Sequence, residues 1–253
     1  MSSETAKETK TDEKLVERLF AAGAHFGFTK SRRHPTVIPY LFGNKQGTDI
    51  FDLEKTTKLL DKAKQVLNEA GKAGKMILLV GTKDEIASIV KECAEKLDTP
   101  YVTNRWIGGT LTNFSEIKKR LARLNDLSVQ GESGELERKY TKKERVLIGR
   151  ESDKLTFNFG GIKEIEKTPQ LIVVVDPRHN SIAVEEANEL NIPVIGVTSS
   201  DANLRHITYP VLANDSLQSS VRVVLDELSE AYLAGKSEFT PAKKEEDKKQ
   251  KRS

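Results

Sequence analysis

Residues 76–97 read MILLVGTKDEIASIVKECAEKL, and this stretch decides the fold class of the chain. Its first five residues, Met76–Val80, form an uninterrupted apolar run, which is typical of a strand buried on both faces. A helical pattern follows over Thr82–Leu97. A doubly buried strand that leads straight into a helix predicts the first unit of a parallel sheet covered by helices.

The same alternation returns along the rest of the chain. Four further strands are predicted from short apolar runs, namely Pro100–Val102, Leu171–Val175, Pro193–Val197 and Tyr209–Leu212. Helical patterns over Ser181–Leu190 and Asp215–Ala234 follow the third and fifth strands. Because strands that alternate with helices pair in parallel, we expect an α/β fold of three layers, with helices on both faces of a five-stranded parallel sheet.

A long interruption separates the second strand from the third. Two charged, leucine-bearing segments, Asn113–Leu127 and Thr141–Leu155, are joined by the glycine-rich sequence QGESGE. Leu121 and Leu124 give the first segment a narrow apolar stripe, which favours two helices packed as an antiparallel coiled-coil hairpin. A single broken crossover helix is the alternative, but crossovers rarely need so many residues. We therefore predict an inserted helical hairpin over about residues 113–156.

An extension made of a helix and a hairpin is predicted ahead of the sheet. Leu15, Leu19 and Phe20 have helical spacing, so a short helix is expected to end at Ala22. Two strands, Val37–Phe42 and Thr48–Phe51, are expected to form a hairpin that turns at Gly43-Asn44. Asp52 is then expected to cap a long helix. The apolar face of that helix is predicted to comprise Leu59, Leu60, Ala63, Val66 and Leu67.

Polar composition sets off both ends of the chain. Residues 1–12 are polar and are predicted to be disordered. Residues 236–253 are dense in charge and are predicted to form a flexible tail, for which solvation is a simpler interpretation than nucleic-acid contact. The segment between them, residues 13–235, is expected to form one α/β domain that carries the hairpin.

Charge and cysteine content narrow the functional classes. The 41 basic and 38 acidic side chains leave a net charge of only +3, which by itself does not indicate nucleic acid. From Arg18 to Thr48, however, cations occur without any acidic residue, so the excess is local. Cys93 is the only cysteine, which excludes an intrachain disulfide. With no signal sequence and no apolar run that could span a bilayer, we expect a soluble cytoplasmic protein.

Motifs that could carry catalysis or bind a metal are weak. Val80–Lys83 lacks the spaced glycines of a nucleotide-binding loop, although Lys83 remains a candidate phosphate contact. Asp176–His179 has no accompanying nucleophile, so Asp176 is expected to accept hydrogen bonds from the next helix. His25 and His34 have no acidic or cysteine partner nearby. We therefore predict no catalytic residue, no metal site, no cofactor and no small-molecule substrate.

The segment from His25 to Phe51 suits RNA better. Lys30, Arg32 and Arg33 supply cations that neutralise phosphates. Interleaved with them are aromatic side chains, which stack on unpaired bases: Phe26, Phe28, Tyr40 and Phe42. Core packing is the preferred interpretation of Phe26 and Phe42. RNA binding is preferred for Lys30–Arg33, because Pro35 and Pro39 are expected to hold the flanking chain extended.

Residues 105–114, RWIGGTLTNF, form a second candidate contact. The stretch contains the only tryptophan and no residue that could act as a nucleophile or general base. Trp106 is expected to anchor the loop, while Arg105, the backbone of Gly108-Gly109 and Asn113 face an anion. Asn113 and Glu116 have the spacing of a capping box, which predicts that a helix begins here.

These motifs together resemble one protein family. GAHFG at residues 23–27, RR at 32–33, PY-FG at 39–43, VGTK at 80–83, NRWIGGTLTN at 104–113, FGGIK at 159–163 and EANELNIPVIGV at 186–197 occur in order. They are similar to the universal small-subunit ribosomal protein S-two family, and the resemblance runs from about Leu15 to Gly235.

The resemblance implies a flavodoxin-like sheet with a coiled-coil insertion and a structural, non-catalytic role in the bacterial small (30S) ribosomal subunit. It also implies binding to 16S ribosomal RNA and to neighbouring proteins, including the large mRNA-binding protein S-one. The RNA-facing motifs of the family fall on His25, Lys30, Arg32, Arg33, Arg105, Trp106 and Asn113. With Lys83, Gly108 and Gly109, they complete the predicted RNA-binding set.

The sequence departs from the family pattern at two places. Phe28 stands where many members have a histidine, and His34 stands where many have a tryptophan followed by asparagine, so a metal site that uses the missing histidine is not expected. TSSDANLRHI, at Thr198–Ile207, replaces the family's D-T-N-x-D-P loop, so contacts of that loop are not carried over. Two alternatives stay open, namely a nucleotide-binding enzyme on the same fold and a protein scaffold that acts through the hairpin.

Overall fold

The computed structural model describes residues 13–133 and 135–239. Its centre is a five-stranded parallel sheet with strand order β5-β4-β6-β7-β8. The strands are β4 (Ile77–Val80), β5 (Tyr101–Val102), β6 (Leu171–Val175), β7 (Val194–Thr198) and β8 (Tyr209–Leu212). The predicted α/β fold with a five-stranded parallel sheet is therefore confirmed, and each strand lies close to its predicted bounds.

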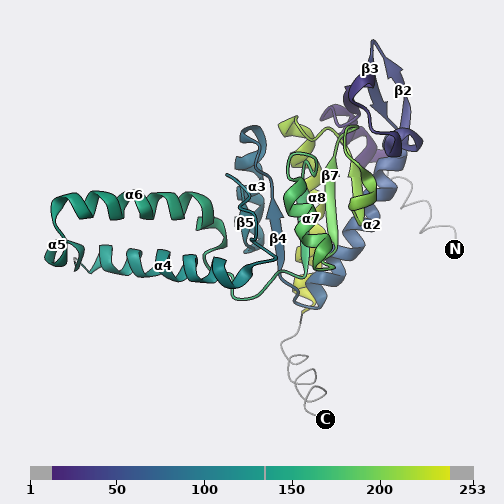
Figure 1. Cartoon of the computed structure of the whole chain (residues 1–253). Helices are drawn as coiled ribbons and strands as arrows, with labels where there is room; N and C mark the ends of the chain where they lie inside the picture. The colour runs from purple at the N-terminus through teal and green to yellow at the C-terminus, as the bar shows by residue number, and fades with distance from the viewer. Residues whose placement is uncertain (1–12, 134, 240–253) are drawn as a thin grey trace.

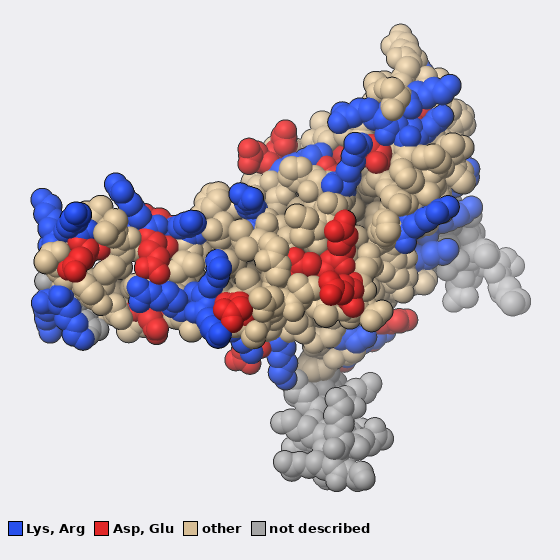
Figure 2. Space-filling view, in the orientation of Figure 1, with Lys and Arg blue, Asp and Glu red and all other residues tan. Residues whose placement is uncertain are grey.

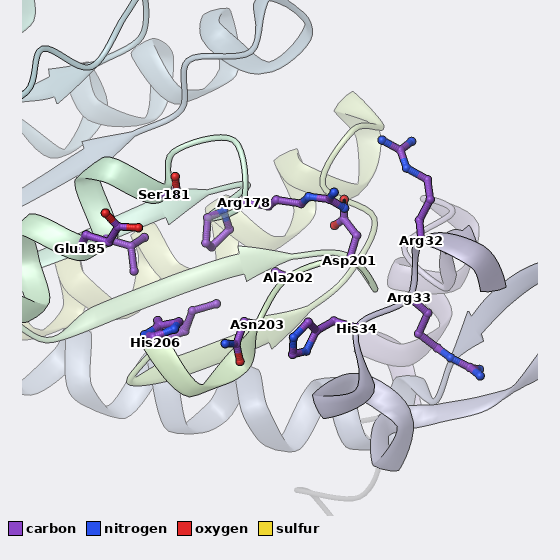
Figure 3. Close-up of a pocket in the computed structure, with 13 residues that line it drawn as sticks. Arg32, Arg33, His34, Arg178, Ser181, Glu185, Asp201, Ala202, Asn203 and His206 are labelled. Atoms are coloured by element: carbon purple, nitrogen blue, oxygen red, sulfur yellow. Dashed lines mark hydrogen bonds and ion pairs between the residues drawn. The ribbon is translucent and has the colours of Figure 1, made fainter.

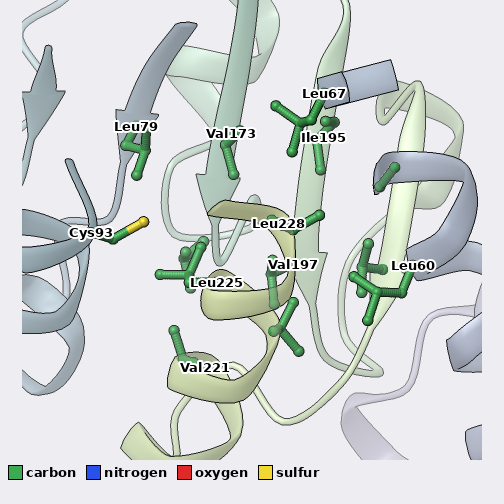
Figure 4. Packing of buried hydrophobic residues seen from close by; sticks show 14 of the residues in the cluster. Leu60, Leu67, Leu79, Cys93, Val173, Ile195, Val197, Val221, Leu225 and Leu228 are labelled. Atoms are coloured by element: carbon green, nitrogen blue, oxygen red, sulfur yellow. The ribbon is translucent and has the colours of Figure 1, made fainter. Parts of the chain in front are cut away.

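Helices cover both faces of this sheet (Figure 1). Successive strand residues point to opposite faces, so Leu79, Val173 and Ile195 lie in one core layer while Leu78 and Ile172 lie in the other. The first layer is closed by α2 (Leu53–Lys72), α3 (Asp84–Leu97) and α8 (Gln218–Ser237), as Figure 4 shows. The second layer is closed by α7 (Ser181–Glu189) together with residues from the interruption. Burial on both faces explains why these strands are apolar without alternation.

The long helix α2 begins and packs as its sequence predicts. Asp52 caps it by accepting hydrogen bonds from the amides of Glu54 and Lys55, at 3.1 and 3.3 Å. Leu60, Ala63 and Leu67 are buried, and Leu59 and Val66 are partly buried. The predicted apolar face of α2 is confirmed.

The interruption forms a pair of helices that extends from the β5 edge of the sheet (Figure 1). It consists of α4 (Phe114–Glu132), α5 (Glu135–Lys139) and α6 (Lys142–Phe159), with α4 and α6 side by side. Arg123 of α4 donates two hydrogen bonds to Glu151 of α6, both 3.1 Å long. Leu121 and Leu124 are buried, so the leucine stripe of α4 packs rather than faces solvent.

The capping box predicted at the start of α4 is wrong. Asn113 occupies the cap position but its side chain accepts no hydrogen bond from the helix amides. Its oxygen accepts from the Ser115 hydroxyl at 3.3 Å, and Glu116 pairs with Lys119 instead. A capping box does occur at the start of α6, where Thr141 and Glu144 exchange hydrogen bonds. Matching spacing alone does not decide whether the two side chains turn toward the backbone.

The region before α2 differs from its prediction in two ways. Residues 13–21 are helical, as expected, but the residues after them form a third strand, β1 (Phe26–Thr29), that the sequence analysis missed. β1 and β2 (Leu41–Lys45) flank β3 (Thr48–Phe51) in an antiparallel sheet. The hairpin turns at Gln46-Gly47, which both have positive φ, and not at Gly43-Asn44.

The prolines have the opposite effect to that expected. Pro35–Tyr40 forms a 3-10 helix, with Pro35 in its first turn and Pro39 inside it, so the chain after Arg33 is compact. A fixed φ near −65° fits a 3-10 helix as well as an extended segment. Phe26 and Phe42 are not core residues either, because they are 44% and 82% exposed. Phe42 lies at the edge of the small sheet, where nothing covers it within the described residues.

At the carboxyl end, α8 continues to Ser237, past the predicted boundary at residue 235. The predicted disorder of residues 1–12, and the part of the predicted tail from residue 240 onward, lie outside the described residues. Cys93 is a free, buried thiol that lies 3.0 Å from the Ser229 hydroxyl in the first core layer.

Candidate nucleic-acid interface

An internal ion pair lies at the point of the sheet where proteins of this architecture usually bind ligands. The chain leaves β4 for β5 on one side and β6 lies on the other, so the crevice between β4 and β6 is the topological switch point. Lys83, which follows β4, forms a salt bridge with Asp176, which follows β6. Its ammonium group also lies 3.2 Å from the Ser216 hydroxyl and 4.0 Å from Asp215.

Electrostatics hold Lys83 in this position. Burial acts to lower the pKa of Lys83, but the hydrogen bond to Asp176 and the charge of Asp215 outweigh it and raise the pKa. Only 21% of the Lys83 side chain is exposed. Its positive charge is therefore already matched by carboxylates of the same chain, which weakens the prediction that Lys83 contacts phosphate. Asp176 also accepts a 2.9 Å hydrogen bond from the amide of His179, as expected.

The loop at residues 105–113 is fastened to a buried glutamate. Glu186 of α7 is 7% exposed and accepts a 3.0 Å hydrogen bond from the Trp106 indole. It also accepts from the amides of Gly109 at 2.8 Å, Leu111 at 2.9 Å and Thr112 at 3.3 Å. The sequence analysis expected the backbone of Gly108-Gly109 to face an anion, and the anion that the Gly109 amide faces is a side chain of the same protein.

This arrangement divides the loop into an inner and an outer part. Trp106 is buried, as expected, and the amide of Gly109 points inward rather than toward RNA. Arg105, Gly108 and Asn113 remain exposed. Only these three members of the predicted set can therefore offer a surface here without movement of the loop.

Sequence reasoning missed Glu186. A signal was present, because Ala183, Val184 and Ala187 place position 186 beside the buried face of the helix. A glutamate among apolar helix positions indicates a buried acceptor with donors opposite it. The donors themselves lie 74 to 80 residues away in the chain, so the sequence does not identify them.

The basic segment Lys30–Arg33, which follows β1, also has exposed and partly buried members. Lys30 and Arg32 are exposed, and the Arg32 guanidinium lies 4.8 Å from the centre of the Phe28 ring. Arg33, in contrast, is 22% exposed in its side chain and donates a 3.3 Å hydrogen bond to the fully buried Asp49. Arg33 is thus partly used to neutralise a carboxylate inside the fold.

His25 belongs to a small aromatic stack. Its ring lies 4.4 Å from the Phe20 ring and 4.0 Å from the Phe26 ring. Burial, and then the nearby charge of Lys45, lower the pKa of His25, so the ring favours its neutral form. A neutral imidazole packed against two phenylalanine rings offers no positive charge to a phosphate.

The structure brings some of the predicted residues together and separates others. The segment around Arg32 packs near β8, because the amide of His34 donates a 2.8 Å hydrogen bond to the carbonyl of Ser200 and Val37 packs against Leu212. Arg105 follows β5, at the other edge of the same sheet. The predicted set therefore forms two separate surfaces, with Lys83 between them.

A cavity of about 410 Å³ lies beside Arg32 (Figure 3). It lies where β6 and β7 end and α7 begins, at the carboxyl edge of the sheet and next to the switch point between β4 and β6. Its lining combines apolar, cationic and polar side chains. They are Arg32, Arg33, His34, Pro177, Arg178, Ser181, Val184, Glu185, Asp201, Ala202, Asn203, His206 and Ile207. Apart from the basic segment, the sequence analysis assigned none of them to binding.

Among residues 13–133 and 135–239, no group of three or more His, Cys, Asp and Glu side chains is arranged to hold a metal ion. None of the described helices is long and apolar enough to cross a membrane.

Known proteins define the class to which this fold and these surfaces belong. A relative from Mesoplasma florum is 39% identical over 90% of this chain and 84% of its own length. Relatives from Salinibacter ruber and Lawsonia intracellularis are 38% and 37% identical, over 92% and 88% of this chain and 72% and 76% of their own lengths. All three are named small ribosomal subunit protein uS2, so the class is that of ribosomal proteins.

A family model described as ribosomal protein S2 matches residues 19–235, and the chain belongs to that family. The resemblance seen in the sequence motifs is therefore confirmed, with relatives from bacteria. So are the non-enzymatic, structural role and the location in the ribosome, since both are properties of the family.

Proposed function

We propose that this protein helps to build the bacterial small ribosomal subunit by binding 16S ribosomal RNA through the Arg32 surface. This surface consists of Lys30 and Arg32 together with Arg178 and His206 across the adjoining cavity. The observation that carries the proposal is that Lys30 and Arg32 are exposed in the 3-10 turn that follows β1. No carboxylate partner of either is found among the described residues.

The distribution of charge supports this choice. Figure 2 shows Lys and Arg side chains gathered at the end of the molecule that carries β2 and β3. Exposed cations on a fixed scaffold neutralise phosphates and release counterions, and they hold a folded RNA in register. Phe28 keeps the Arg32 guanidinium in one place, so less rotamer freedom is lost on binding.

We propose that Arg105, Gly108 and Asn113 form a second RNA contact, which follows β5 at the edge of the five-stranded sheet. His25, Arg33, Lys83, Trp106 and Gly109 support the two surfaces from within. One contact near β8 and one after β5 would fix the distance between two RNA segments, which is a structural role without chemistry.

We further interpret residues 13–235 as one domain in which the helix and small sheet before α2 form an N-terminal extension. In this interpretation α4 and α6 form an inserted coiled-coil hairpin over about residues 113–156. Blue side chains are spread along this pair in Figure 2, so it offers a further surface for neighbouring ribosomal proteins. The family resemblance suggests the large mRNA-binding protein S-one as one such partner. Deletion of residues 130–144, followed by an assay of S-one recruitment, tests whether the hairpin binds it.

The central experiment measures binding to transcribed 16S ribosomal RNA as a function of salt. The variant is Lys30→Ala with Arg32→Ala, and the matched control is Lys58→Ala with Lys62→Ala, two exposed lysines of α2. We expect the logarithmic salt slope of the first variant to fall by roughly 1.5, because each phosphate contact contributes about 0.7 to 0.9. The control should match the unmodified protein. A wild-type affinity that does not change between low and moderate salt would overturn the proposal.

A further inference from the structure

We propose that the cavity beside Arg32 accepts one unpaired nucleotide of the bound RNA, with its base inside and its phosphate at the rim. This inference rests on the proposed RNA-binding function and adds a specific mode of contact to it. The cavity volume of about 410 Å³ falls in the range of small-ligand sites, which is about 300 to 1,000 Å³. A single nucleotide is a ligand of this class, whereas a duplex does not fit into an opening of this size.

The floor of the cavity suits the faces of a base. Pro177, Ala202 and Ile207 are buried apolar residues that line it, and Val184 of α7 completes the apolar surface. The rings of His34 and His206 lie on either side of Asn203 in Figure 3. Unpaired bases stack on apolar, imidazole and guanidinium surfaces, and this mode of binding tolerates different bases.

The rim of the cavity suits a phosphate. Arg32 and Arg178 both line the cavity, Arg32 from the basic segment and Arg178 from the turn after β6 (Figure 3). The charge of Arg178 is matched by Asp201, with 2.8 Å between Nη1 and Oδ2. Arg32 is held over Phe28 and has no carboxylate partner among the described residues, so it retains a full charge for a phosphate.

Asp201 positions the second arginine of the rim. Its side chain is 7% exposed, and its Oδ2 atom pairs with Arg178, which lines the cavity. A buried carboxylate that is paired in this way orders the guanidinium, so less rotamer freedom is lost when a nucleotide binds.

The cavity can be closed without disturbing the core. Ser181 is an exposed first residue of α7 that lines the cavity, and Ile182 beside it is 53% exposed and lies outside the lining. Ser181→Trp places a large ring over the opening without a change of charge. Ile182→Trp places the same ring on the same helical turn but away from the cavity, and it is the matched control.

The test is ultraviolet crosslinking of the full chain to transcribed 16S ribosomal RNA, with mass spectrometry of the crosslinked peptides. We expect nucleotides attached to peptides that contain residues 177–185 or 201–207. Ser181→Trp should remove these crosslinks and weaken RNA binding about tenfold, because the base can no longer stack inside the cavity. Ile182→Trp should behave as the wild type, and melting temperatures of both variants should confirm that they fold.

The remaining outcomes separate this inference from the proposed function. If the wild type binds RNA in a salt-dependent way but yields no crosslink at the cavity, and Ser181→Trp binds equally well, the nucleotide site is wrong and RNA binding stands. If the wild type binds no RNA, both proposals are wrong. Calorimetry with AMP and GMP distinguishes the source of the nucleotide. Binding of these that Ser181→Trp blocks, without any RNA crosslink, would assign the cavity to free nucleotides and overturn the inference.

Discussion

The carboxylate of Glu186 accepts a 3.0 Å hydrogen bond from the indole of Trp106, and it accepts further hydrogen bonds from three backbone amides of the same loop. The loop connects β5 to α4, so this one side chain ties the edge of the sheet to the first helix of the inserted pair. A carboxylate that accepts hydrogen bonds from several buried donors holds a loop more firmly than packing alone. Each buried donor left without an acceptor would cost free energy.

Replacement of Glu186 should destabilise the fold strongly. Glu186→Ala leaves the indole and the amides of Gly109 and Leu111 without an acceptor, so we expect the free energy of unfolding to fall by about 3 kcal/mol. Glu186→Gln keeps one acceptor oxygen and should lose less. Urea denaturation measures both. Glu185→Ala, at the exposed neighbouring position, is the control and should stay within about 0.5 kcal/mol of the wild type.

The two adjacent arginines of the basic segment should behave differently. Arg33→Ala leaves the fully buried Asp49 with only the amide group of Asn44, at 3.1 Å, so the free energy of unfolding should fall by about 1 to 3 kcal/mol. Arg32→Ala removes an exposed side chain and should change stability by less than about 1 kcal/mol. Thermal or urea unfolding of both variants checks this, and equal losses would mean that Arg33 is not the structural member of the pair.

Asp215 should make stability depend on pH. Burial, and then the charge of Asp176, raise the pKa of Asp215 from 3.8 to about 7. Between these values the folded protein holds a proton that the unfolded chain releases, so the free energy of unfolding should fall as pH rises from about 4 to 7. A shift of this size corresponds to at most about 4 kcal/mol.

The variant Asp215→Asn isolates this contribution. It retains an oxygen that can accept from the amide of Ser199, which lies 2.9 Å from Asp215 Oδ2, but it does not titrate. Urea unfolding of both proteins at several pH values should give curves that diverge, with the wild type losing stability relative to the variant as pH increases. Parallel curves would show that Asp215 ionises in the fold as it does in water.

Replacement of a helical glycine by alanine should destabilise the protein where packing requires glycine and stabilise it where it does not. A Cβ atom at Gly235 of α8 would overlap the carbonyl of Asn68 in α2, so Gly235→Ala should cost about 3 kcal/mol or more. Gly149 of α6 has open space around the Cβ position, and Gly149→Ala should stabilise the protein by about 0.5 to 1 kcal/mol through helix propensity. Melting temperatures of the two variants should therefore move in opposite directions.

Much of the fold could be read from local patterns. Each strand of the parallel sheet lies within a residue of its predicted position, because a strand buried on both faces needs consecutive apolar residues and no distant information. The long helix α2 was equally clear, since Asp52 and the spacing of Leu60, Ala63 and Leu67 are local signals. The turn at Gln46-Gly47 was missed because Gly43-Asn44 carries the same type of turn signal three residues earlier.

The sequence by itself determined the parallel sheet, the interruption between β5 and β6, and Trp106 as a buried anchor. Only the tertiary structure decided the partners of the polar groups. Glu186 accepts a hydrogen bond from an indole 80 residues away, and Lys83, after β4, forms a salt bridge with Asp176, after the neighbouring strand β6. Hydrophobic periodicity depends on residues only a few positions apart in the sequence. The partner of a charged or amide group depends instead on which distant segments the fold brings together.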